Sequence, residues 1–253
     1  MSKRFFADKM EVCISPDRKT MGEVAARDFA ECVKELLKTK EYIRVIFAAA
    51  PSQNDFLKAI VEDESIDFGR IDAFHMDEYI GLPEDAPQGF GNFLRRGIFD
   101  LRSFHSVTYL HGEGTAEELC EAYAAKLAEA PVDIVCMGIG ENGHIAFNDP
   151  HVADFNDPKA VKVVSLDETC RMQQVHDGCF ASIDLVPTHA VTLTIPTLAN
   201  VPYHFCIVPT THKAPAVKAT VEGPIGEACP ATVLRNLPGS TLYLDEAAAA
   251  LLK

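Results

Sequence analysis

The sequence predicts an α/β fold, a single three-layer, Rossmann-like domain with a mostly parallel sheet. Short apolar runs alternate with amphipathic stretches along the chain, which is typical of a parallel sheet covered by helices. The 253 residues are enough for one large buried core, and no linker-like stretch divides them. We therefore expect one domain over residues 1–253.

The first half of the chain contains two predicted strands, each close to a predicted helix. Residues 20–37 should form an amphipathic helix, because apolar side chains recur there at three- and four-residue spacing. Buried strands are expected at 43–49 and 71–76, with a helix from about Ser52 between them.

The second half repeats this alternation with more strands. Residues 117–128 are rich in Ala, Leu and Glu and predict a helix, and 132–137 is the most strand-like segment of the protein. Further strands are expected at 190–195, 203–208 and 240–244, and further helices near 213–221 and 231–236.

The overall charge limits the class of ligand. The formal net charge is −14 at pH 7, so a nucleic acid or an anionic membrane surface would be repelled. A small anionic substrate remains compatible, because a few local cations and helix N-termini can bind it. We therefore expect a small-molecule ligand, with no nucleic acid and no membrane as partner.

Cysteine usage and the first residues bear on the compartment. The eight cysteines form no CxxC pair and show no Cys/His spacing suited to zinc. The opening residues, MSKRFFADKMEV, carry charges throughout and contain no apolar signal core. The longest apolar stretch is too short to span a bilayer. These features predict reduced thiols, no metal site and a cytoplasmic location.

Polar residues at strand ends are candidate site residues, because ligands of open α/β sheets bind beyond the carboxyl ends of the strands. The segment IDAFHMDEYIGLP (71–83) brings Asp77 and Glu78 to such an end. A carboxylate there can act as a general base toward a bound substrate. The alternative is that one of them only caps the following turn.

The most informative segment is VDIVCMGIGENGHIAFNDP (132–150). It places Asn142, His144 and Asp149 in one short loop after a strand. These three side chains could form a carboxylate–imidazole–amide proton relay, in which the acid fixes the tautomer of the imidazole. The alternative is a histidine that is only hydrogen-bonded within its loop.

Glycines in the same segment also need an interpretation. Gly138, Gly140 and Gly143 let the backbone approach a ligand closely, and they match the GxGxxG pattern. A dinucleotide site requires a long helix that starts at these glycines. Pro150 follows too soon for such a helix, so a nicotinamide cofactor is disfavoured.

A third strand end, IFAAAPSQNDF (46–56), could bind an anion. A strand followed by Pro and Ser52 and then by a helix presents free N–H groups, with Ala49 beside them. Lys213, which opens a predicted helix, and Arg171 are the plausible cationic partners. A solvated surface position is the alternative for each of the two.

Together these segments resemble the glucosamine-6-phosphate deaminase/isomerase family, which is related to 6-phosphogluconolactonase. MDEYIGLP (76–83) and GIGENGHIAFNDP (138–150) resemble its two characteristic segments, and the similarity continues through 209–224 and 229–252. The lactonase branch typically reads GHTASLFP where this chain has GHIAFNDP, and it lacks MDEY. The resemblance is therefore to the deaminase branch.

The resemblance implies a reaction and roles for individual residues. The implied reaction converts an amino-sugar 6-phosphate, glucosamine 6-phosphate or an epimer, to a ketose 6-phosphate plus ammonia, without a metal or organic cofactor. Asp77 matches the base that moves a proton between C2 and C1. His144, supported by Asn142 and Asp149, matches the residue that opens the sugar ring, and Lys213 matches a phosphate ligand. The candidate substrate-binding residues are Ala49, Ser52, Glu78, Gly138, Gly140, Arg171 and Lys213.

Three positions depart from the family pattern. The chain has AAAPSQ (48–53) where the family usually has a Thr-Gly-Gly-Thr-Pro-like phosphate loop. Asp149 stands where the relay acid is usually Glu, and His176 stands where a second phosphate-binding Arg is usual. Two alternatives to the deaminase function therefore stay open, a hydrolase of a sugar-phosphate lactone and a sugar-phosphate sensor without turnover.

The expected assembly is a monomer or a dimer rather than a hexamer. Family members that form allosteric hexamers commonly carry a longer C-terminal tail beyond the position of Lys253, where this chain stops. The negative net charge also disfavours packing many copies together.

Overall fold

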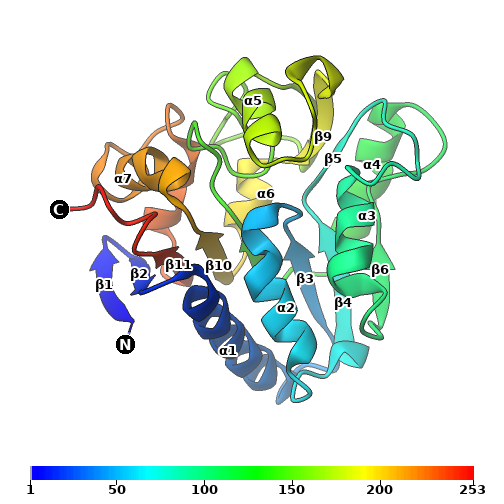
Figure 1. The fold of residues 1–253 in the computed structure, drawn as a ribbon. Coiled ribbons are helices and arrows are strands. Elements are labelled where there is room, and N and C mark those ends of the chain that lie inside the picture. Colours follow the sequence, from blue (N-terminus) through cyan, green and yellow to red (C-terminus); the bar gives the residue numbers. More distant parts are fainter. Residues whose placement is uncertain (1) are drawn as a thin grey trace.

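The computed structural model of the chain describes residues 2–253, and a sheet of eight strands runs through the molecule (Figure 1). Its strands are β1 (Lys3–Ala7), β2 (Met10–Ser15), β3 (Ile43–Phe47), β4 (Ile71–His75), β6 (Ser106–Thr108), β7 (Ile134–Met137), β10 (Tyr203–Val208) and β11 (Ser240–Asp245). Their order is β1-β2-β11-β10-β7-β3-β4-β6, and every neighbouring pair except β1 with β2 is parallel. The prediction of a mostly parallel sheet is confirmed.

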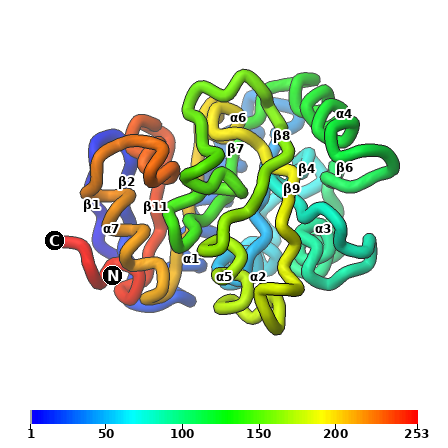
Figure 2. Tube along the Cα trace, turned by 90° about the horizontal axis from the view of Figure 1, so that it is seen from above, coloured from blue at the N-terminus to red at the C-terminus, as the bar shows by residue number. Residues whose placement is uncertain are grey.

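Helices cover both faces of this sheet, which confirms the three-layer prediction (Figure 2). They are α1 (Arg18–Leu37), α2 (Asn54–Glu62), α3 (Phe90–Leu94), α4 (Ala116–Ala128), α5 (Glu168–His176), α6 (Ile195–Ala199) and α7 (Ala214–Glu222). Successive β3 side chains enter different apolar clusters: Phe47 packs with Phe29 of α1 and Phe56 of α2, while Ile46 belongs to the cluster that holds Tyr123 of α4. The sheet is thus buried on both sides, as parallel sheets require.

Capping residues set where two of the predicted helices begin. The helix expected at 20–37 is α1, which starts earlier because the side chain of Asp17 caps its first turn. The helix expected at 117–128 is α4, preceded by a reciprocal capping box between Thr115 and Glu118. Both predictions are confirmed, with the starts displaced by one or two residues.

A second, three-stranded sheet lies beside the carboxyl ends of the large one. It consists of β5 (Asp77–Tyr79), β9 (His189–Leu193) and β8 (Val161–Ser165), in the order β5-β9-β8, and both pairs are antiparallel. The strand expected at 190–195 therefore exists as β9 but does not join the large sheet. A short apolar run does not indicate which sheet the strand will join. The three-stranded sheet contains most of the MDEY segment, because Asp77–Tyr79 form β5 and pair with β9.

The prediction of an α-helix at 231–236 is wrong in the type of helix. Residues Pro230–Asn236 form a 3-10 helix of seven residues instead. Pro230 begins it, and Pro238 follows too soon for a longer α-helix to develop.

No helix formed by residues 2–253 is long and apolar enough to cross a membrane. All eight cysteines are free in the described chain, and five of them are buried. These buried thiols pack as small apolar side chains.

Candidate active site

The carboxyl ends of β3, β7 and β10 meet at the point where the strand order reverses. In the sheet, β7 is followed by β10 and β11 on one side of this point, and β3 is followed by β4 and β6 on the other side. Ligands of open α/β sheets bind at such a switch point. A cleft there encloses about 60 Å³, with α5 lying over it at the top of Figure 1. Seven of the expected site residues line it: Ala49, Ser52, Asp77, Gly138, Gly140, His144 and Lys213.

Asp77 enters this cleft from the first position of β5, where it pairs with Thr192 of β9. Its side chain is only 7% exposed, and no donor among residues 2–253 hydrogen-bonds its carboxylate. Burial, and secondarily the charge of Glu78, raises the pKa of Asp77 well above its usual value. A carboxylate in such a setting holds a proton more readily than an exposed one, which suits proton transfer near neutral pH.

His144 is held in one orientation by two oxygen atoms. Its Nδ1 lies 2.7 Å from Asn142 Oδ1 and 2.9 Å from Asp149 Oδ1. Both oxygens are acceptors, so the proton of a neutral imidazole must reside on Nδ1. Nε2 is then the free basic atom of a residue that lines the cleft.

Asn142 and Asp149 are themselves fixed by further hydrogen bonds. Asn142 Nδ2 donates to Asp149 Oδ1 and to Asp167 Oδ2, each at 3.0 Å. Burial of Asp149 favours its protonated form, but hydrogen bonds from His144 and Asn142 outweigh burial and lower its pKa. Asp149 therefore stays ionised, which keeps the imidazole in its tautomer.

Two glycines make this loop possible. A Cβ atom at Gly140 would lie 2.1–2.3 Å from atoms of the His144 ring, so only glycine lets the imidazole pack there. Gly143 has a φ of +83° and faces Cys229 at a distance that also excludes a side chain. Two of the three glycines that matched a dinucleotide pattern, Gly140 and Gly143, thus allow the loop that holds His144.

The opposite side of the cleft carries the candidate anion site. Lys213 is 5% exposed, and its ammonium group has no hydrogen bond or ion pair within residues 2–253. Burial lowers its pKa, although the charges of Asp177 and Glu141 act in the other direction. Ser52 lines the same cleft, and a Cβ at Gly138 would lie 3.4 Å from Ser52 Oγ. Lys213, Ser52, Ala49 and Gly138 are thereby brought together.

Two expected substrate-binding residues point elsewhere. The guanidinium of Arg171 donates to the backbone carbonyls of Ile183 and Val186, and Arg171 does not line the cleft. These carbonyls use its donors, so the structure assigns Arg171 to holding the turn after α5. The carboxylate of Glu78 accepts hydrogen bonds from the backbone N–H groups of Tyr79, Phe90 and Gly91 and lines a different cavity.

Sequence reasoning missed three residues around the site. His75 Nδ1 hydrogen-bonds the Asp77 carbonyl at 2.9 Å, while its Nε2 accepts from Leu110 N at 2.8 Å. Asp167 caps α5 and binds Asn142. Gln174 of α5 is 7% exposed and lines the cleft. The position of Asp167 before a helix was the one detectable signal, since Asp is a preferred N-cap residue.

Within residues 2–253, two groups of donor atoms at this site lie close enough together to hold a metal, and they share Asp149; the second consists of Asp149, His151 and Asp167. The ligand atoms of His144, Asp149 and Cys170 lie within 4.8 Å of one another. However, the first two are already hydrogen-bonded to each other, and burial raises the pKa of the Cys170 thiol well above its usual value. A metal needs the thiolate, so these residues fit a hydrogen-bonded relay better than a metal.

Comparison with known proteins points to one family. A family model described as glucosamine-6-phosphate isomerases/6-phosphogluconolactonase matches residues 16–243. The glucosamine-6-phosphate deaminase of Streptomyces avermitilis is 34% identical over 251 residues, which cover 96% of this chain and 93% of that protein. The glucosamine-6-phosphate deaminase of Bacillus thuringiensis is also 34% identical, over 234 residues, covering 92% of this chain and 87% of that protein.

Solved structures agree with this assignment. A structure described as a monomeric glucosamine-6-phosphate deaminase superposes with a TM-score of 0.86 at 28% identity, covering 95% of this chain and 99% of that one. The 6-phosphogluconolactonase of Thermotoga maritima superposes with a TM-score of 0.75 at 19% identity, covering 92% of this chain and 98% of that one. The second comparison shows that the fold is shared.

Proposed function

The chain belongs to the glucosamine-6-phosphate isomerase/6-phosphogluconolactonase family, and from this we propose that it is a deaminating aldose–ketose isomerase of an amino-sugar 6-phosphate. The observation that carries the proposal is the pairing of Asp77 with His144 in one cleft. Among residues 2–253, no donor hydrogen-bonds the buried carboxylate of Asp77, and no partner occupies Nε2 of the His144 imidazole. The first suits proton transfer at carbon and the second suits proton transfer at oxygen.

Ring opening is the first step and is assigned to His144. Its Nε2 accepts the proton of the anomeric hydroxyl and delivers it to the ring oxygen, so that the bond from C1 to that oxygen breaks. The product is an open-chain aldehyde. Asp149 stabilises the transient imidazolium of His144, because its ionised carboxylate places Oδ1 at 2.9 Å from His144 Nδ1.

Isomerisation follows and is assigned to Asp77. The carboxylate removes the proton from C2, which gives an enolamine, and the same carboxyl group then protonates C1. The nitrogen at C2 becomes an imine, water adds to it, and ammonia leaves. The sum is amino-sugar phosphate plus water giving ketose phosphate plus ammonia, with no net oxidation and hence no redox partner.

The phosphate is assigned to the other side of the cleft. Lys213 supplies a buried ammonium, and the segment from Ala49 to Ser52 supplies backbone at the start of the helical turn before α2. The enclosed part of the cleft measures only about 60 Å³. Most of a sugar phosphate therefore lies in the open mouth of the cleft.

The test is ammonia release from glucosamine, galactosamine and mannosamine 6-phosphates, with ketose 6-phosphate measured in parallel. We expect one of the three to give equal amounts of ammonia and ketose phosphate. Hydrolysis of a sugar-phosphate lactone without ammonia release would assign the lactonase function instead. Binding of all three without turnover would assign a sensor.

The proposed assembly is a monomer or dimer. One solved glucosamine-6-phosphate deaminase that superposes on this chain is described as monomeric, which supports the proposal. Light scattering coupled to gel filtration tests this, and a hexameric mass would refute it.

A further inference from the structure

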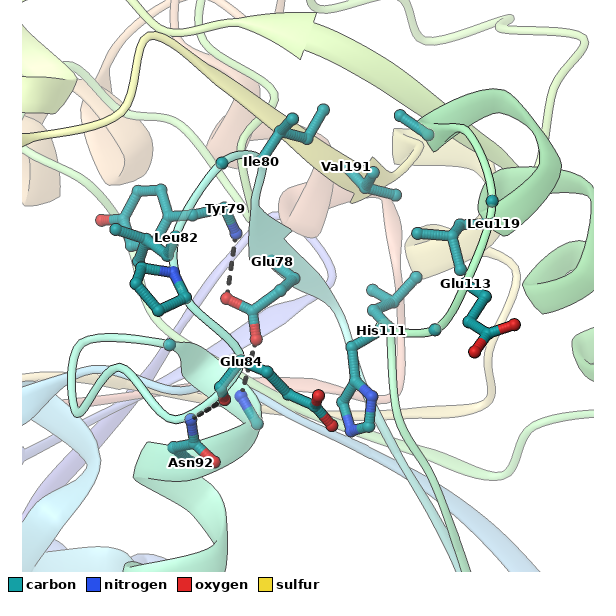
Figure 3. A pocket seen from close by; sticks show the side chains of 18 residues that line it. Glu78, Tyr79, Ile80, Leu82, Glu84, Asn92, His111, Glu113, Leu119 and Val191 are labelled. Carbon is teal, nitrogen blue, oxygen red and sulfur yellow. Dashed lines mark hydrogen bonds between the residues drawn. The ribbon is translucent and has the colours of Figure 1, made fainter.

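A cavity much larger than the cleft lies beside the same strand. It encloses about 480 Å³ and is lined by β5, by the loop that follows it, and by the segment leading into α4 (Figure 3). Side chains alternate along a strand, so Asp77 lines the cleft while its neighbour Glu78 lines this cavity. The size lies within the range of small-molecule sites, and the proposed reaction makes no use of it.

The wall combines aliphatic side chains with carboxylates. Its aliphatic part includes Ile80, Leu82, Leu110, Leu119 and Val191. Figure 3 shows Ile80, Val191 and Leu119 along one side of the cavity, with Glu113 beside Leu119 and Glu84 beside His111. A ligand with an apolar body would be desolvated against this wall.

The polar part of the wall is negative. Glu78, Glu84 and Glu113 line the cavity, and His111 is the one basic residue among its lining residues, all of which lie in the described chain. The carboxylates of Glu84 and Glu113 have no hydrogen-bond or ion-pair partner within residues 2–253. Arg95 borders the adjacent hollow, but its guanidinium lies over the Tyr109 ring, 4.6 Å from the ring centroid. An anion such as a sugar phosphate would be repelled, whereas a cation would find unpaired acceptors.

We propose that this cavity binds a small organic ammonium ion, with its charged group near Glu84 and Glu113 and its apolar body against the aliphatic wall, and that its binding acts on Asp77 through β5. The occupant is a small molecule because the site is a concave cavity rather than a flat surface. The net charge of −14 adds a general attraction for cations.

Two contacts connect the cavity with Asp77. The backbone N–H of Leu110, a lining residue, donates to His75 Nε2 at 2.8 Å, and His75 Nδ1 donates to the Asp77 carbonyl at 2.9 Å. Burial keeps His75 neutral by lowering its pKa to about 4, so this tautomer persists at neutral pH. A shift of the cavity wall at Leu110 is therefore transmitted to the backbone of Asp77.

The second connection is electrostatic. The charge of Glu78 is one cause of the raised pKa of Asp77. A cation bound in the cavity, which Glu78 also lines, partly offsets that charge, so it should lower the pKa of Asp77. The acid limb of the kcat/KM profile should then move to lower pH, with roughly a threefold gain in rate on that limb. This second effect rests on the proposed function, whereas the binding itself does not.

The binding test uses calorimetry with three probes of similar shape. They are 2-phenylethylamine, which is cationic at pH 7, 2-phenylethanol and 3-phenylpropionate. We expect the amine to bind at least about tenfold more tightly than the alcohol, a difference of about 1.4 kcal/mol, and the carboxylate not to bind. Equal affinity for all three probes, or tighter binding of the carboxylate, would overturn the proposal. It would also be overturned if the amine did not bind at a concentration on the order of 10 mM.

Variants locate the site. The double variant Glu84→Gln/Glu113→Gln should lose at least about tenfold in amine affinity. The control Glu117→Gln/Glu121→Gln removes the same charge from exposed positions of α4 outside the cavity and should bind normally. Ala116→Phe keeps the charge but fills the cavity, so it should abolish binding. Equal amine affinities of Glu84→Gln/Glu113→Gln and of its control would show that the amine is attracted only by the net charge of the protein.

The coupling test compares pH profiles of ammonia release with and without saturating amine. A shift of the acid limb in the wild type that is absent from Glu84→Gln/Glu113→Gln supports the coupling. Amine binding without any shift would overturn the coupling. Should the protein release no ammonia at all, the proposed function fails, while calorimetry still decides whether the cavity is an ammonium site.

Discussion

Replacing Asp77 by Asn should lower activity while raising stability, because the carboxylate is both the proposed base and a poorly solvated charge. The side chain is 7% exposed, and residues 2–253 provide no hydrogen-bond donor to its carboxylate. Asn has nearly the same shape but cannot accept a proton from C2. A positioned general base contributes about 10²–10⁴-fold to a rate, so kcat should fall by at least this factor, or about 2.7–5.4 kcal/mol of barrier.

The stability effect follows from the direction of the pKa. Burial raises the pKa of Asp77 in the folded protein, so the folded state binds the proton more tightly than the unfolded chain does. Ionisation therefore costs stability progressively as pH rises from the unfolded value of about 3.9 to the raised folded value. The full cost remains at higher pH. Replacement by Asn removes this ionisation cost but buries an amide whose hydrogen bonds are unmet.

The net gain at pH 7 should be about 1 kcal/mol, or about 2–4 °C in Tm for a chain of this size. Below the unfolded pKa the gain should disappear, and the variant should be no more stable than the wild type. Thermal unfolding at several pH values and ammonia release at pH 7 measure both effects. Asp184→Asn is the control, because Asp184 is exposed and should change neither quantity. Near-normal turnover by Asp77→Asn, or a lower Tm at neutral pH, would refute the reasoning.

Three further outcomes are expected at the same cleft. His144→Gln should slow turnover of the cyclic substrate by about 10²-fold or more but affect an open-chain analogue much less; equal losses on both substrates would assign His144 to another step. Asp149→Asn should lower kcat by about 10²–10⁴-fold through loss of the required imidazole tautomer, and an unchanged kcat would show that Asn142 alone orients the ring. Lys213→Met should raise KM by about 10–100-fold, which corresponds to one charge-assisted contact of about 1.5–3 kcal/mol, without loss of Tm; an unchanged KM would place the phosphate elsewhere.

Much of the large sheet could be predicted because its strands carry a local signal. The strands expected at 132–137 and 203–208 contain the runs 134–137 and 205–208, which are apolar on both faces and differ in pattern from the helical segments of the chain. Since the carboxyl ends of parallel strands share one edge, residues after different strands could be expected to meet there. This reasoning placed Asp77 and His144 near one another without a contact being known.

The small sheet could not be predicted in the same way. β5 has only three residues, and its partner β9 lies far along the chain, so pairing rather than propensity determines it. The role of Arg171 was equally hidden, because its partners are backbone carbonyls of Ile183 and Val186. Such acceptors exist at every residue, and only the path of the loop decides which of them a guanidinium reaches.

The strand-end pattern by itself did not distinguish Asp77 from Glu78 as the reactive carboxylate, although the family resemblance implied Asp77, and hydrogen bonding separates the two. Burial raises the pKa of both side chains. Glu78, however, accepts bonds from three backbone N–H groups at 2.9–3.0 Å, which stabilise its ionised form and fix it against the start of α3. Asp77 has no such donors within the described chain, so its proton affinity responds to what enters the cleft. Of two adjacent acids on one strand, the one without donors is the better placed to exchange a proton with a substrate.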